Sequence, residues 1–197
     1  RALLRAFGGP LAAPSANPSG RVSPTRVAHV LAGLSGRIEA VLDGGTCAVG
    51  VESTIVGLDG PATVLRPGGV PLEALEAALG QRLVQRVEFE KPTAPGQLAS
   101  HYAPMAGVRL QVEAPQPGEI WVGFGGQCEA AALTLSASGD LVEAAANLFH
   151  ILREADALAG PEGHIGFAPI PERGLGCAIN DRLRRAAAPR GQGLRQM

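Results

Sequence analysis

The sequence predicts an α/β protein made of two units joined by a linker. Short apolar runs alternate with helix-like segments along most of the 197 residues. A hydrophobic fraction of 46% is enough for a real core. Residues 88–106 contain three prolines and show neither a helical nor a strand period. We therefore expect a first unit at 1–87, a linker at 88–106 and a second unit at 107–197.

The first unit is expected to alternate helices and strands. Residues 2–7 resemble the end of a helix, because Gly8 and the glycine and proline after it stop helices. The apolar run at 10–13 predicts a short strand. A helix is expected at 25–34, with Ser23 as its N-cap and a proline where the first turn tolerates one. Further elements are expected as a strand at 38–42, a hairpin from 52–58 and 63–65, and a helix at 71–79.

The second unit is expected to continue this alternation. Its strands are predicted at 108–112, 120–124, 133–135 and 164–170, and its helices at 140–158 and 179–188. Gly174-Leu175-Gly176 resembles half of a dinucleotide-binding fingerprint. The sixth position of that pattern is Ile179, and no clear strand leads directly into it, so a dinucleotide site is not predicted.

Charge and hydropathy exclude several classes of protein. The formal net charge of -1 gives no general attraction for nucleic acid or anionic lipid, although it is compatible with a local basic patch. Apolar stretches are interrupted well before the roughly 20 residues that a membrane span needs. No signal peptide is visible. We expect a globular protein with no membrane association.

The cysteines and histidines predict no metal site. Cys47 and the other two cysteines are far apart and odd in number, which favours a reducing cytoplasm over disulfides or zinc. We expect Cys47 to be a small packed residue. His29 is expected to be a surface or packing residue, and His150 and His164 lack acidic or thiol neighbours at ligand spacing.

The small, polar segment 14–25 is the most informative part of the chain. It ends where a helix is expected to begin, and the free N–H groups and positive dipole end of a helix favour an anion, typically a phosphate. The expected strand at 10–13 would bring Ser15 and Asn17 to the sheet edge, where open α/β sheets bind ligands. The same residue types also form ordinary turns, so spacing alone leaves both interpretations open.

Three other positions carry polar side chains that suit a ligand site. Residues 52–54 put a glutamate, a serine and a threonine at the start of an apolar strand, facing either a site or solvent. Arg66 follows a strand end and suits either phosphate or solvent. His101 and Tyr102 lie in the linker, where Tyr102 would either cover a nucleotide or pin the linker to a domain surface.

Several separated motifs occur together in this chain. They are Pro14-Ser15-Ala16-Asn17 with Ser19-Gly20 and Ser23-Pro24-Thr25, residues 50–55, Leu65-Arg66-Pro67-Gly68, Pro95-Gly96 with His101-Tyr102-Ala103-Pro104, and Gly174-Leu175-Gly176 with 178–183. Their residues, order and spacing resemble the Sua5 type of the Sua5/YrdC/YciO family, the threonylcarbamoyl-AMP synthases. The resemblance implies a partial YrdC-like twisted open α/β sheet domain, followed by a small Rossmann-like Sua5 domain.

The resemblance also implies a reaction. L-threonine, bicarbonate and ATP would form L-threonylcarbamoyladenylate and pyrophosphate, for the t6A modification of tRNA, with t6A-transfer proteins as downstream partners. Ser15 and Ser53 would bind L-threonine. ATP would be bound by Asn17, Ser23, Thr25, Arg66 and Tyr102. Mg²⁺ would accompany ATP, held by phosphates and water more than by protein carboxylates.

The chain departs from the family pattern ahead of the Ser-x-Asn loop. The family uses an N-terminal Lys-x-Arg motif there, whereas Lys91, the sole lysine, lies in the linker. We expect the 197-residue chain by itself to be weakly active or inactive, and the synthase to be a longer protein. Two other classes stay open: non-catalytic binding of tRNA or double-stranded RNA, and a nucleotide-binding regulatory role.

Overall fold

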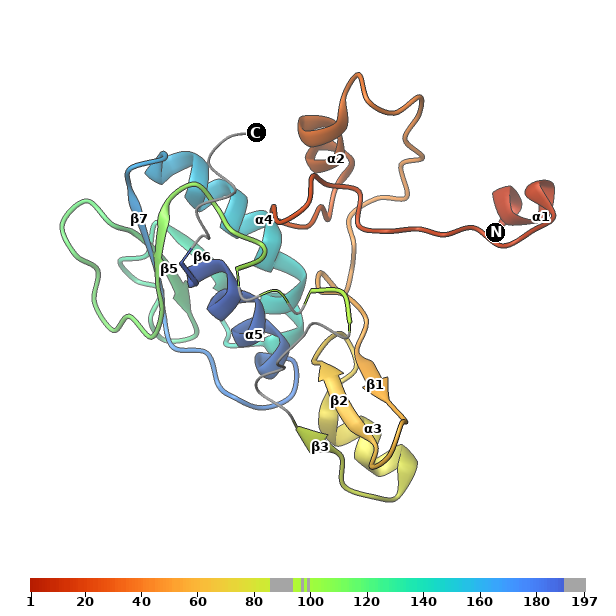
Figure 1. Ribbon diagram of the computed structural model, residues 1–197. Coiled ribbons are helices and arrows are strands. Elements are labelled where there is room, and N and C mark those ends of the chain that lie inside the picture. Colours follow the sequence, from red (N-terminus) through yellow and green to blue (C-terminus); the bar gives the residue numbers. More distant parts are fainter. Residues whose placement is uncertain (86–93, 97, 99, 190–197) are drawn as a thin grey trace.

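A computed structural model describes residues 1–85, 94–96, 98 and 100–189, and it shows an α/β protein with two sheets (Figure 1). The elements of the first part are α1 (Ala2–Phe7), α2 (Val27–Leu34), β1 (Ile55–Gly57), β2 (Thr63–Arg66), α3 (Leu72–Leu79) and β3 (Val84–Gln85). Those of the second part are β4 (Gly107–Arg109), β5 (Ile120–Phe124), β6 (Leu133–Ser136), α4 (Leu141–Ala159), β7 (His164–Phe167) and α5 (Gly176–Ala187). The predicted α/β class is confirmed.

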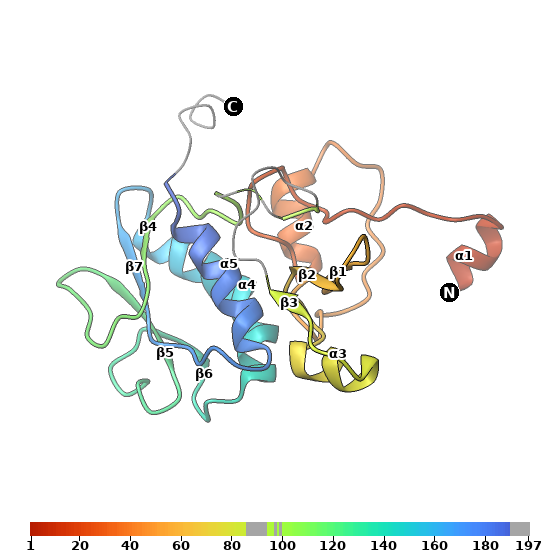
Figure 2. The same ribbon diagram turned by 60° about the horizontal axis from the view of Figure 1, so that its bottom comes forward.

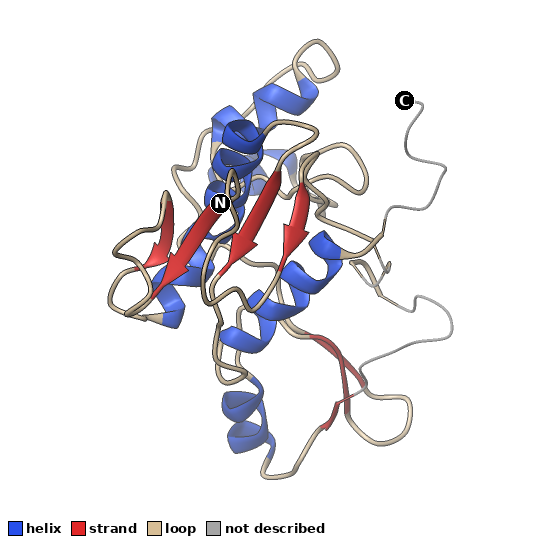
Figure 3. Ribbon diagram, turned by 90° about the vertical axis from the view of Figure 1, so that its left-hand side faces the viewer, coloured by secondary structure: helices blue, strands red, loops and turns tan. Residues whose placement is uncertain are grey.

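The second part is built on a parallel four-stranded sheet with the order β4-β7-β5-β6 (Figure 3). Helix α4 contacts β5, β6 and β7, and α5 contacts β4 and α4. The N-cap of α4 is Asp140, whose carboxylate accepts hydrogen bonds from the N–H groups of Val142 and Glu143. Leu148, Ile165 and Ile179 are fully buried where helices and sheet meet, so this part holds the main core.

The first part has a smaller sheet. Strands β1 and β2 form the expected antiparallel hairpin, and the short β3, which the sequence pattern did not indicate, pairs parallel to β2. Helices α1, α2 and α3 contain no buried residue. Figures 1 and 2 show α1 apart from the rest, at the end of an extended segment.

Two predicted strands are absent. Residues 10–13 and 38–42 have no regular structure, and no strand of the described chain lies beside them. A strand without a neighbour leaves its N–H and C=O groups unpaired, so β-propensity alone does not form one. The helix predicted at 25–34 starts at Val27 with Arg26 as N-cap, so the assignment of Ser23 as its N-cap is wrong. Residues 88–93 of the expected linker lie outside the described part.

Candidate active site

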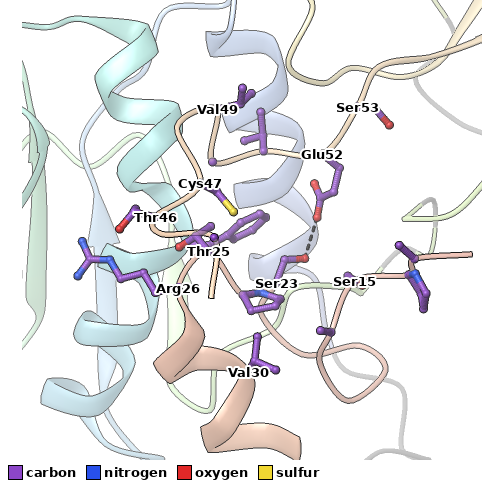
Figure 4. A pocket seen from close by; sticks show the side chains of 18 of the residues that line it. Ser15, Ser23, Thr25, Arg26, Val30, Thr46, Cys47, Val49, Glu52 and Ser53 are labelled. Carbon is purple, nitrogen blue, oxygen red and sulfur yellow. Dashed lines mark hydrogen bonds between the residues drawn. The ribbon is translucent and has the colours of Figure 1, made fainter. Parts of the chain in front are cut away.

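A cavity of about 1050 Å³ opens where the loop before α2, the segment before β1 and helix α4 come together (Figure 4). Six of the seven predicted ligand-binding residues line it. They are Ser15, Ser23, Thr25, Ser53, Arg66 and Tyr102. These side chains come from four separate segments, so the fold gathers into one cavity residues that the sequence keeps as many as 87 positions apart.

Asn17, the seventh predicted residue, is not among the residues that line the cavity. Its Nδ2 donates hydrogen bonds to the carbonyl oxygens of Pro18, at 2.9 Å, and Arg21, at 3.1 Å. Its Oδ1 is buried and has no hydrogen-bond partner among the described residues. In this structure Asn17 shapes the turn after Ser15, and its contact with ATP stays a prediction.

Ser23 is held by a partly buried ion pair that bridges the two parts of the chain. Its Oγ donates a 2.7 Å hydrogen bond to Oε1 of Glu52, as Figure 4 shows. Oε2 of Glu52 accepts from Nε of Arg182, on α5, at 2.9 Å. The Arg182 side chain is 1% exposed and also donates to the carbonyl oxygen of Pro67 and to the carboxylate of Asp181. Arg182 thus connects the cavity wall to α5, the helix that contacts β4 of the second sheet.

The Glu52 carboxylate is expected to make the protein sensitive to acid. Burial would raise the pKa of Glu52, but the charge of Arg182 and the Ser23 hydrogen bond outweigh burial and lower this pKa below its usual value. The ion pair therefore stabilises the fold above the ordinary glutamate pKa, and this stabilisation is lost as the pH falls through the lowered one. Urea unfolding between pH 7 and pH 3 should show a shallower loss of stability in Glu52→Gln than in the wild type. An equally large loss of stability between pH 7 and pH 3 in the variant would contradict this role of Glu52.

Arg66 presents a guanidinium group whose described acceptors are neutral. Nε and Nη2 donate to the carbonyl oxygen of Ser53, at 3.2 and 2.8 Å, and Nη1 donates to that of Pro95 at 3.0 Å. Burial and the nearby charge of Arg182 lower the pKa of Arg66, although an arginine remains protonated in proteins. A positive charge that lines a cavity without a bonded carboxylate suits an anionic ligand such as a phosphate.

Tyr102 packs firmly at the edge of the cavity. It is 1% exposed, its ring centroid lies 5.2 Å from that of Phe149 on α4, and Cζ of Arg182 lies 5.5 Å from the same ring centroid. Burial raises the pKa of Tyr102 to about 12, so the phenol is neutral near pH 7. Burial likewise lowers the pKa of the adjacent His101, which also lines the cavity. The described end of the linker therefore packs onto α4 beside the predicted ligand site.

The sequence predicts the serine and threonine hydroxyl groups of the cavity and Arg66, but it does not predict the ion pair between Glu52 and Arg182. In the sequence, Glu52 stands out only as part of a polar triplet, and Arg182 only as part of a motif. The signal available for Arg182 was the Asp-Arg pair inside a terminal helix that also carries buried apolar residues such as Ile179. A buried arginine normally has a carboxylate partner, but its identity cannot be inferred from spacing.

The described residues contain no group of three or more histidine, cysteine, aspartate or glutamate side chains able to hold a metal ion. The three cysteines are free. Cys47 is exposed, so the prediction that it is a packed residue is wrong. None of the helices within the described ranges has the length and apolar character to cross a bilayer.

The fold and the cavity define an α/β protein whose candidate ligand site lies beside a parallel sheet. A family model described as "Threonylcarbamoyl-AMP synthase, C-terminal domain" matches residues 70–188, and one described as "Telomere recombination" matches residues 1–68. The chain belongs to the threonylcarbamoyl-AMP synthase family, as its motifs predicted.

Individual relatives agree with this assignment. The chain is 38% identical to a threonylcarbamoyl-AMP synthase of Pyrococcus abyssi, over 92% of this chain and 58% of that protein. It is 36% identical to one of Bacillus subtilis, over 96% of this chain and 60% of that protein. The crystal structure of P. abyssi Sua5 complexed with L-threonine superposes with a TM-score of 0.79 at 34% identity, covering 94% of this chain and 60% of that one. The chain thus spans about three fifths of the length of these relatives.

Proposed function

We propose that this chain carries the part of an L-threonylcarbamoyladenylate synthase that holds L-threonine and the phosphates of ATP. The observation that supports this most is the gathering of Ser15, Ser53 and Arg66 around one cavity of about 1050 Å³. The family assignment adds independent support, and the solved relative binds L-threonine. The division at 1–87, 88–106 and 107–197, and a cytoplasmic location, are part of the same proposal.

Each residue has a physical task in this proposal. The hydroxyl groups of Ser15 and Ser53 would hydrogen-bond L-threonine and orient its amine towards bicarbonate. Arg66 would offer its charge to the phosphates of ATP, and Ser23 and Thr25 would form the wall beside them. Tyr102, neutral and packed on Phe149, would cover the nucleotide and exclude water. Mg²⁺ would arrive with ATP, coordinated by phosphate and water oxygens.

Ligand binding to the 197-residue chain tests this proposal without requiring turnover. Isothermal titration should detect L-threonine and Mg·ATP, with Ser15→Ala and Ser53→Ala weakening the binding of L-threonine by about tenfold each, because each variant loses one hydrogen bond to the ligand. Ser35→Ala is the matched control, since Ser35 is exposed and does not line the cavity. Its affinities should equal those of the wild type.

Other results of the same titrations would contradict the proposal. If both serine variants bind L-threonine as tightly as the wild type does, the cavity is not the L-threonine site. Absence of ATP binding, together with salt-dependent binding of tRNA or duplex RNA, would favour the RNA-binding alternative. Release of pyrophosphate from ATP in the presence of L-threonine and bicarbonate, measured on the same protein, decides whether the chain alone is active.

A further inference from the structure

The histidine on the first turn of α2 contacts the backbone of the cavity wall. His29 is the third residue of this helix, and its side chain turns back towards the residue before the N-cap. Nδ1 of His29 accepts a 3.1 Å hydrogen bond from the N–H of Thr25 and lies 3.4 Å from the Thr25 hydroxyl. This resembles a capping box, in which the third helical residue reaches back to a free N–H group.

Thr25 in turn bonds to a second segment of the cavity wall. It is 3% exposed, and its carbonyl oxygen accepts a 3.0 Å hydrogen bond from the N–H of Cys47. Thr25 and Cys47 both line the cavity, whereas His29 does not. The imidazole thus lies behind the site and fixes two backbone segments that form it.

Only a neutral imidazole can make this contact, because a protonated ring has no acceptor. The surroundings of His29 favour the neutral form. Its ring stacks on that of His150, with 5.5 Å between centroids, and burial, followed by Arg153, His150 and Arg26, lowers the pKa of His29 to about 4. The charged and titratable groups around it are Arg26 before the helix, His150, Arg153, Glu154 and Asp156 on α4, and Arg21 on the neighbouring loop.

We propose that His29 is a positioning residue that, in its neutral form, holds the Thr25 and Cys47 backbone in the geometry that the ligands require. The His29 ring also stacks on that of His150, and this second contact joins α2 to α4. Its effect on ligand affinity rests on the proposed function, while its effect on the backbone does not. Acid that protonates His29 should therefore release the Thr25 N–H first and loosen the Cys47 contact next.

Two substitutions of His29 separate the acceptor from the ring. His29→Asn keeps an acceptor atom close to the position of Nδ1 but removes the ring, and His29→Phe keeps the stacked ring but removes the acceptor. We expect amide hydrogen exchange, measured by NMR at pH 7, to be about tenfold faster at Thr25 in His29→Phe, with Cys47 also less protected. His29→Asn should stay within about threefold of the wild type. The control His150→Phe keeps a stacking ring and should leave Thr25 protected.

The pH dependence and the ligand affinity complete the test. The Thr25 protection factor should fall towards pH 4 in the wild type and stay more nearly constant in His29→Asn. Mg·ATP affinity should fall in His29→Phe and be retained in His29→Asn. Unchanged Thr25 protection in His29→Phe would overturn the inference, as would equal ATP affinities in the two variants when the wild type binds ATP. If the wild type binds no ATP or L-threonine, the proposed function fails, and the exchange data still decide what His29 does to the backbone.

Discussion

Replacement of Arg182 by methionine is expected to lower the free energy of unfolding by about 3–5 kcal/mol, a large part of the stability of a domain of this size. The guanidinium group is 1% exposed and bonds to Glu52, Pro67 and Asp181. Methionine fills much of the volume but leaves the Glu52 carboxylate partly buried without its cation. Urea unfolding at pH 7, followed by far-UV circular dichroism, measures the loss.

The neighbouring Arg184 provides the matched control on the same helix. Its ion pair with Glu172 is exposed, with both side chains 53% accessible, so Arg184→Met should change the stability by less than about 1 kcal/mol. Adding Glu52→Gln to Arg182→Met should recover part of the loss, because a neutral amide in that position needs no cation. Equal effects of Arg182→Met and Arg184→Met would show that the Arg182–Glu52 ion pair contributes no more than a surface pair.

The second sheet and its helices could be predicted because local signals agree with the tertiary structure there. The helix expected at 140–158 was found as Leu141–Ala159, since Asp140 is an N-cap and a glycine follows the helix. Strand β5 was found at the expected residues, 120–124. Buried parallel strands are short continuous apolar runs, which are visible in a single sequence.

The start of α2 could not be predicted because distant partners decide it. Serine is a residue type that N-caps favour, but the hydroxyl group of Ser23 bonds to Glu52, 29 residues away in the sequence. His29 instead satisfies the N–H of Thr25 from inside the helix. Local propensity shows which residues can cap a helix, whereas the tertiary contacts determine which of them does so.

The residue types that line the candidate site could be predicted from the sequence. The ion pair that holds the wall of this site could not. Short motifs can be recognised in a single sequence, and such motifs contain Ser15, Ser53 and Arg66. The Arg182 to Glu52 pair joins residues 130 positions apart, and no periodicity connects them. The pair also gives the second unit a physical role beyond carrying the linker, because Arg182 contacts Glu52 and the Tyr102 ring together.

Alanine at Gly50 is expected to have the other large effect, a loss of about 2–5 kcal/mol in the free energy of unfolding. Gly50 has a φ of +74°, which costs a non-glycine residue about 1–2 kcal/mol. A Cβ atom there would lie 2.1 Å from the carbonyl oxygen of Ala145 and 2.4 Å from Cα of Ala146, both in the backbone of α4. Neither atom can rotate away, so the segment must shift, and such overpacking costs about a further 1–3 kcal/mol.

Gly45→Ala separates the two causes, because Gly45 has a similar φ of +84° but no atom within 4 Å of the new Cβ. It should lose only the cost of the backbone conformation, about 1–2 kcal/mol. Gly50→Ala should in addition weaken L-threonine binding, since the shift begins three residues before Ser53, whereas Gly45→Ala should affect stability more than affinity. Of the two glycines, only Gly50 lies close to the backbone of α4. Equal losses of stability in the two variants would therefore show that the segment before β1 packs less closely on α4 than the structure indicates.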